Sequence, residues 1–149
     1  MVFVSITRLR IRSWRFMPGF AIAAWRTGAQ VGRAEGFLAG SLLPDRDRTF
    51  WTMTLWRNQA AMRRYMTSGA HLKAMPKLLA WCDEASIVHW EQDDAVAPDW
   101  TEADRRMRAE GRPSKVRQPS SRHGDLSYAA PRTTGAVAMP ATVAQSGRD

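Results

Sequence analysis

The chain has 149 residues, a length that suits one domain, and hydrophobic residues make up 44% of it, which is enough for a core. No segment approaches the ~20 unbroken apolar residues that a membrane span needs, and the apolar start, residues 1–11, contains two arginines and no small-residue cleavage site. The single cysteine, Cys82, excludes an intrachain disulfide and suits a reducing compartment. We therefore expect a cytoplasmic protein without a membrane span.

The formal net charge of +8 is concentrated in the first part of the chain. Residues 1–92 hold 13 Lys and Arg against 6 Asp and Glu, whereas residues 93–149 hold 9 against 8. Such a field favours an anionic ligand or weak nucleic-acid affinity. The arginines are scattered and follow no nucleic-acid-binding pattern, so a solvated basic surface is the alternative and no nucleic-acid partner is expected.

The first half of the chain predicts a strand, a helix and a hairpin in that order. Residues 2–9 are rich in β-branched and aromatic side chains, as strands are, and in Met17–Gly32 mostly apolar residues recur at helical spacing. Residues 36–43 and 50–56 form two further predicted strands, joined by the polar turn 44–48. In the strand 50–56, Trp56 shares a face with Phe50, whereas Trp51 faces the other way.

A broken helix and a fourth strand follow. Asn58 is a plausible N-cap for a helix over residues 59–67. Gly69 and Pro76 bracket a break, and Pro76 predicts a kink or a restart because it lacks the N–H that a helix interior needs. Residues 85–90 form the last predicted strand. The order βαββαβ over about 90 residues predicts a ferredoxin-like α+β fold, a four-stranded antiparallel sheet with two helices on one face.

The composition changes after Asp94, so we divide the chain into a domain over residues 1–94 and an extension over residues 95–149. Residues 100–111 predict a short helix capped near Thr101. Residues 112–149 are rich in Pro, Ser, Arg and Gly without periodicity, which is typical of a disordered tail.

Two helices on one face leave the other sheet face uncovered, with apolar and aromatic side chains on alternate positions. Exposed apolar patches of this kind usually mark an interface. Two such sheets packed together would cover both faces, so the sequence predicts a homodimer.

The sequence also resembles a known superfamily. The likeness rests on the strand FWTMTLW running into WRNQAAMRRYMTSGAH, and on the closing strand ASIVHW. These segments resemble the dimeric α+β barrel superfamily, which includes antibiotic-biosynthesis-monooxygenase-like proteins. The segment GFLAGSLLPDRDRTFWTMTLW is also similar to the spheroidene-monooxygenase-like branch and to an uncharacterised domain family near both. The resemblance covers about residues 1–92, and the members include cofactor-free oxygenases, haem-binding oxygenases and proteins without a known reaction.

The resemblance implies an apolar cavity between sheet and helices. His71 matches a histidine that members of the superfamily frequently carry on the helix after the strand FWTMTLW. It would lie in this cavity and act as a base or, in a haem-binding member, as the iron ligand. Asn58 or a tryptophan N–H would stabilise an oxyanion. The expected substrate-binding residues are Trp51, Trp56, Trp81, Trp90 and Arg8.

Each of these residues also has a structural interpretation. His71 is about as consistent with a capping or core histidine as with a ligand or base, and His89 reads more readily as a half-buried strand residue. The tryptophans are mostly core or interface residues by type, and Arg8 is more typical of a surface. Cys82 has no base at a recognisable spacing and reads as a small buried hydrophobe.

Three functions remain open from the sequence. The first is a monooxygenase that acts on a small aromatic or isoprenoid (polyene) molecule without a cofactor, with His71 as base. The second is a haem protein with His71 as iron ligand and arginine near the propionates. The first strand has Ser5 and Thr7 where haem-degrading relatives carry Asn, which argues against a haem-degrading triad. The third is a non-catalytic dimer that binds a small apolar molecule.

Overall fold

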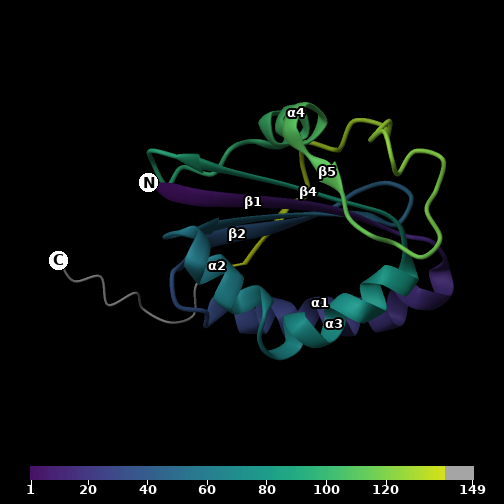
Figure 1. Cartoon of the computed structure of the whole chain (residues 1–149), viewed down its shortest axis with the longest axis horizontal. Coiled ribbons are helices and arrows are strands. Elements are labelled where there is room, and N and C mark those ends of the chain that lie inside the picture. Colours follow the sequence, from purple (N-terminus) through teal and green to yellow (C-terminus); the bar gives the residue numbers. More distant parts are fainter. Residues whose placement is uncertain (140–149) are drawn as a thin grey trace.

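The computed structural model describes residues 1–139. Four long antiparallel strands, with short flanking ones, form a sheet that has helices on both faces (Figure 1). The strands are β1 (Val2–Ile11), β2 (Phe37–Pro44), β3 (Thr49–Trp56), β4 (Cys82–Gln92), β5 (Arg112–Pro113) and β6 (Val137–Ala138). The α-helices are α1 (Met17–Gly32), α2 (Gln59–Met66), α3 (Gly69–Trp81) and α4 (Trp100–Glu110), and a 3₁₀ turn, Trp14–Phe16, precedes α1.

The sheet has the order β5-β4-β1-β3-β2-β6, so the first strand of the chain is at its centre. β1 pairs with β3 on one side and β4 on the other, which places Ser5 opposite both Thr54 and His89. The predicted order βαββαβ and the α+β fold class are confirmed by the four long strands and the helices between them.

Alternation along the strands divides the side chains between two layers, as the sequence predicts. On β1, Val4 and Ile6 are buried in the core cluster beneath α4, whereas Ser5 and Thr7 point towards α1 and α3. On β3, Trp51 belongs to the first layer and Trp56 to the second. The helix-side layer contains the cavity described below.

The second predicted helix is two helices, α2 and α3. The Asn58 side chain caps α2 by accepting a hydrogen bond from the Ala61 N–H at 2.9 Å, as predicted. The chain turns at Gly69, whose φ of 58° lies in the left-handed region that glycine adopts without strain. The expected restart at Pro76 is wrong, because α3 continues through it to Trp81; the alternative, a kink, stays a prediction. Pro76 is on the exposed side, where the carbonyl that it leaves unbonded can be hydrated.

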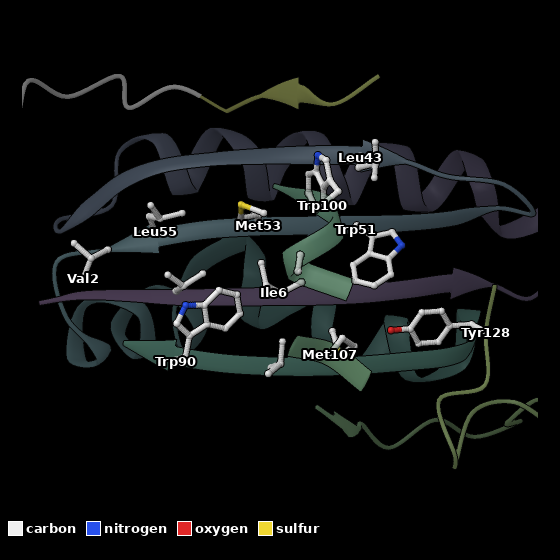
Figure 2. Close-up of a cluster of buried hydrophobic side chains, with 13 residues drawn as sticks. Val2, Ile6, Leu43, Trp51, Met53, Leu55, Trp90, Trp100, Met107 and Tyr128 are labelled. Atoms are coloured by element: carbon white, nitrogen blue, oxygen red, sulfur yellow. The ribbon is translucent and has the colours of Figure 1, made fainter. Parts of the chain in front are cut away.

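The sheet face opposite α1 and α3 is covered by the chain itself. Figure 2 shows Trp100 and Met107 of α4 above the side chains of β3, β1 and β4, with Tyr128 beside Trp51. All of these side chains are buried, and the Trp51 and Tyr128 rings meet edge to face with centroids 5.6 Å apart. The homodimer prediction rested on an uncovered face, and α4 and Tyr128 remove that premise.

Residues 112–139 also differ from the expected disordered tail. Their backbone N–H groups bond the sheet and helices, from Ser114 to the Ala85 carbonyl at 2.8 Å and from Met139 to the Gly40 carbonyl at 2.8 Å. β5 pairs with β4 at one edge of the sheet and β6 pairs with β2 at the other. The composition that predicted disorder therefore belongs here to an irregular segment that packs on the sheet. The rest of the predicted tail, residues 140–149, lies outside the described residues.

Candidate functional site

A cavity of about 290 Å³ lies between the sheet and the helix layer. Its floor comes from β1, β3 and β4, and its roof from α1, α2 and α3. Most of the lining is apolar, with Phe20 and Leu78 among the larger side chains, and a few hydroxyl groups stand between them, including those of Ser5 and Thr54. An apolar pocket with a few convergent polar groups is the usual form of a small-molecule site.

His71 lines this cavity from the first turn of α3. Its ring Nδ1 lies 3.2 Å from the Met66 carbonyl oxygen, which can only accept a hydrogen bond. Nδ1 therefore carries the proton, and Nε2 keeps its lone pair. Burial lowers the pKa of His71 below the ordinary value of 6.5, although the bond to Met66 opposes this shift. At neutral pH the imidazole is a neutral base with a fixed tautomer.

Gln30 of α1 holds the segment that carries His71. Its side-chain oxygen accepts the His71 backbone N–H at 2.8 Å, and its amide nitrogen donates to the carbonyls of Tyr65 and Ser68 at 3.1 and 2.8 Å. One side chain thus satisfies the backbone at the end of α2 and at the start of α3. The sequence did not reveal this role, because Gln30 and His71 are 41 residues apart and share no local pattern.

A second histidine, His89, lines the same cavity from β4. Its ring lies 5.2 Å from that of Phe3 between centroids. Burial lowers the pKa of His89, and the nearby cations Arg112 and Arg63 lower it further. The sequence analysis interpreted His89 as a half-buried residue of a strand. The same residue also forms part of the cavity wall.

Tyr65 and Trp56 close one end of the cavity with their rings 5.3 Å apart. The Tyr65 hydroxyl donates to the Thr27 carbonyl at 3.2 Å, and burial raises the pKa of Tyr65 well above 10. Tyr65 therefore stays protonated and is already engaged. The indole N–H of Trp56 is buried and has no acceptor among the described residues. This donor has lost its hydration without compensation, and its side chain belongs to the wall of the cavity.

The other residues predicted for the site lie elsewhere. Asn58 is exposed at the start of α2, where capping already uses its side-chain oxygen. Trp51 and Trp90 are on the opposite face of the sheet, in the core beneath α4. Trp81 stacks on Phe16 at the end of α3 and does not line the cavity. Only Trp56 among the four predicted tryptophans, together with His71, reaches the cavity.

Arg8, the predicted partner of a substrate anion, is also on the face opposite the cavity. Its guanidinium lies over the Tyr128 ring at 4.0 Å and 3.8 Å from Glu84, a fully buried carboxylate that also has Arg10 at 3.6 Å. Burial lowers the pKa of Arg8, although Glu84 opposes this effect. Arg8 belongs to a buried ionic cluster that joins the sheet to Tyr128.

The cavity does not fit the haem alternative. The Nε2 of His71 is free to bind iron, with Nδ1 oriented by a carbonyl as in many metal-bound histidines. However, Lys115 is the only Lys or Arg that the described residues contribute to the lining, and Arg8, the expected propionate partner, is behind the sheet against Tyr128. The volume is also at the small end of the roughly 300–1,000 Å³ of ligand pockets. Within residues 1–139, no group of three His, Cys, Asp or Glu is arranged to hold a metal ion.

Comparison with known proteins gives the fold context. A mutant of SnoaB, a cofactor-independent oxygenase from Streptomyces nogalater, is 20% identical, with 64% of this chain and 96% of that chain covered and a TM-score of 0.53. Rv0793 from Mycobacterium tuberculosis is 12% identical over 64% of this chain and all (100%) of that chain, with a TM-score of 0.57. An antibiotic biosynthesis monooxygenase is 15% identical over 63% and 100% of the two chains, with a TM-score of 0.55.

These structural neighbours share the ferredoxin-like α+β fold of the antibiotic-biosynthesis-monooxygenase-like proteins, as the sequence resemblance implies. No curated protein matches the sequence. Among the described residues, no helix combines the length and the apolar character needed to cross a membrane. A family model matches residues 14–113, and the chain therefore belongs to the family described as a domain of unknown function, DUF3291.

Proposed function

We propose that the protein is a monooxygenase that binds a small aromatic molecule in the cavity and uses His71 as a general base. The observation that carries this proposal is the state of the His71 ring. A carbonyl fixes its proton on Nδ1, burial lowers its pKa, and the ring lines an apolar cavity. A neutral imidazole beside a desolvated ligand is suited to removing a proton at neutral pH.

The chemistry needs no cofactor if the substrate itself supplies the electrons. His71 removes a proton from an acidic CH₂ group, and the resulting carbanion transfers one electron to O₂. The two radicals combine to a peroxide, which takes up the proton and loses water to leave a ketone. One oxygen atom enters the product and the other leaves as water, so CH₂ plus O₂ gives C=O plus H₂O.

The cavity favours an aromatic substrate over a polyene. The substrate must be acidic enough for an imidazole to deprotonate, which a carbonyl conjugated to an aromatic ring provides and a simple polyene does not. The small volume also favours a compact flat molecule over a long chain. The Trp56 N–H, which has no acceptor among the described residues, is our candidate donor to the substrate oxygen as that oxygen gains negative charge.

Oxygen consumption tests the proposal. Aromatic ketones with an acidic CH₂ group, of which anthrone is a simple tricyclic example, are incubated with the purified full chain and O₂ uptake is followed. Replacement of the base, His71→Gln, is expected to lower kcat by about 10²–10⁴-fold. His89→Gln is the matched control, because it removes the other histidine of the same cavity, and it should cost much less.

Two results would reject the proposal. The first is equal activity of the His71→Gln variant and the unaltered chain. The second is stoichiometric binding of these aromatic ketones without O₂ uptake, which would favour a ligand-binding protein. The absorption spectrum of the protein as isolated provides a third check, since a Soret band lost in His71→Ala would reinstate the haem alternative.

The predicted homodimer stays a prediction, and the two groups proposed for this chemistry, His71 and Trp56, belong to the same chain. With one sheet face covered by α4, two copies would have to associate through another surface. Light scattering after size exclusion measures the oligomeric state of the protein in solution.

A further inference from the structure

The helix layer that roofs the cavity is basic without compensation. α1, α2 and α3 contain no Asp or Glu within their bounds. Their charged side chains are the five cations Arg26, Arg63, Arg64, Lys73 and Lys77. All five of these cations are exposed or half-buried, so the helices present a positively charged surface to solvent.

Large apolar side chains stand on the same surface. On α1, Ile22 is 54% and Trp25 76% exposed, three residues apart and therefore on one side of the helix. On α3, Leu72 is 51% and Met75 40% exposed, again at a spacing of three. The opposite side of α1, including Phe20, is buried against the sheet (Figure 1). Ile22, Trp25 and Leu72 thus project away from the sheet on two adjacent helices.

Beside these side chains lies an open basic depression of about 550 Å³ between the C-terminal half of α1 and α2. Arg26, Arg33 and Arg64 line it together with the amide of Gln30. Glu35 is the one acidic residue in the lining, and it pairs with Arg57 at 3.2 Å. Three guanidinium groups around a shallow surface depression match the phosphates of lipid headgroups.

We propose that the outer face of α1, α2 and α3 binds the anionic surface of a phospholipid membrane. Ile22, Trp25 and Leu72 enter the headgroup region, and the cations of the same helices contact lipid phosphates. This combination of an apolar ridge flanked by Lys and Arg is the usual composition of helices that lie on membranes. A second copy of the chain is disfavoured as the occupant, because two surfaces with the same excess of cations repel each other.

The proposal goes beyond the proposed function and does not depend on it. It does give the cavity a source of apolar ligand, because the helices that would contact the membrane are also its roof. Gly28 of α1 lines the cavity, and a Cβ built there meets no atom within 4 Å, so open space adjoins the helix at this point. An apolar molecule dissolved in the lipid would have a short path into the cavity.

Sedimentation with vesicles tests the membrane contact. The full chain is mixed with vesicles of phosphatidylcholine alone or of phosphatidylcholine with phosphatidylserine, and the bound fraction is measured at low and high salt. We expect binding only to the vesicles that contain phosphatidylserine, with a decrease at high salt. The double variants Ile22→Ser/Trp25→Ser and Lys73→Gln/Lys77→Gln should each weaken binding by about tenfold or more.

Matched controls are available on the other side of the sheet. Val96→Ser removes a side chain that is 69% exposed in the segment before α4, and Arg105→Gln removes an exposed cation of α4. Both controls should bind vesicles as the unaltered chain does. All of the altered side chains are exposed, and unchanged circular dichroism confirms the fold of each variant.

Three outcomes would overturn the proposal. These are no binding to the anionic vesicles, equal loss in the controls and the helix-layer variants, and binding to a DNA duplex without binding to vesicles. The last outcome would show that the basic layer serves a nucleic acid instead. O₂ uptake in the absence of vesicles is measured for the same variants, so that loss of membrane binding and loss of activity are distinguished.

Discussion

Gly28 provides a direct test of the cavity. It lies in the interior of α1, where glycine destabilises a helix by about 1 kcal/mol relative to alanine. The Cβ of an alanine would meet no atom within 4 Å, so the substitution adds neither a clash nor a new contact. Gly28→Ala should therefore stabilise the protein by the helix term alone, about 1 kcal/mol, which corresponds to a rise in Tm of roughly 3 °C for a chain of this size.

Gly19 in the same helix is the matched comparison. A Cβ at Gly19 would lie 3.0 Å from Cη2 and 3.1 Å from Cζ2 of Trp81. The gain in helix propensity would therefore be offset by displacement of the indole, and Gly19→Ala should be neutral or destabilising. Urea unfolding of both variants, with the slope m checked for constancy, gives the two free energies.

Two results would refute this reasoning. If Gly28→Ala destabilises the protein, the space above Gly28 is filled and the cavity is smaller than described. A larger variant, Gly28→Leu, should retain the fold while its side chain competes with ligand for the cavity. Full activity of a stable Gly28→Leu variant would place the substrate elsewhere.

Three further predictions concern ionisable groups. Glu84→Gln should lower the free energy of unfolding in urea by about 3–5 kcal/mol, because it leaves the buried Arg8 without its carboxylate. The control Glu102→Gln, in an ion pair at the surface, should lower it much less, and an equal decrease in both variants would contradict the burial argument. Burial raises the pKa of Cys82 to about 12, so an aromatic disulfide reagent at pH 8 should react only after unfolding, and rapid reaction of the native thiol would refute this. Because the folded pKa of His71 lies below 6.5, the folded state binds fewer protons there than the unfolded state, so stability should fall as the pH drops below 6.5; unfolding measured against pH should show a shallower fall in His71→Gln, and identical profiles would contradict it.

Local patterns in the sequence were sufficient to predict the fold. Period-two alternation on β1 and β3 assigned each side chain to the correct sheet face, including Trp51 and Trp56. The N-cap at Asn58 follows from a side chain that bonds a backbone group three residues away. His71 was singled out because it matches the helix histidine of the superfamily that the sequence resembles, and its side chain lines the cavity.

Contacts between distant parts of the chain could not be predicted in this way. The Gln30 side chain bonds the backbone of His71, which is 41 residues away in the sequence. Arg8 contacts Tyr128, which belongs to a segment that composition alone predicted to be disordered. The covering of the sheet by α4 depends on the path of the chain between β4 and α4, and the sequence of that segment has no periodic pattern from which the path could be predicted. The restart of the helix at Pro76 was predicted wrongly, because the cost of proline in a helix depends on whether the unbonded carbonyl faces solvent. A single sequence does not show which way that carbonyl faces.

The placement of β5 and β6 has a consequence for synthesis of the chain on the ribosome. Both strands follow the four long strands in sequence, yet they occupy the two outer edges of the sheet. β4 would lack its partner β5 until residue 113 has emerged, the apolar face around Trp51 would lack Tyr128 until residue 128 has emerged, and β2 would lack β6 until residue 138 has emerged. Open strand edges pair readily with other chains, so the nascent protein passes through a period of aggregation risk that ends only with its last described residues.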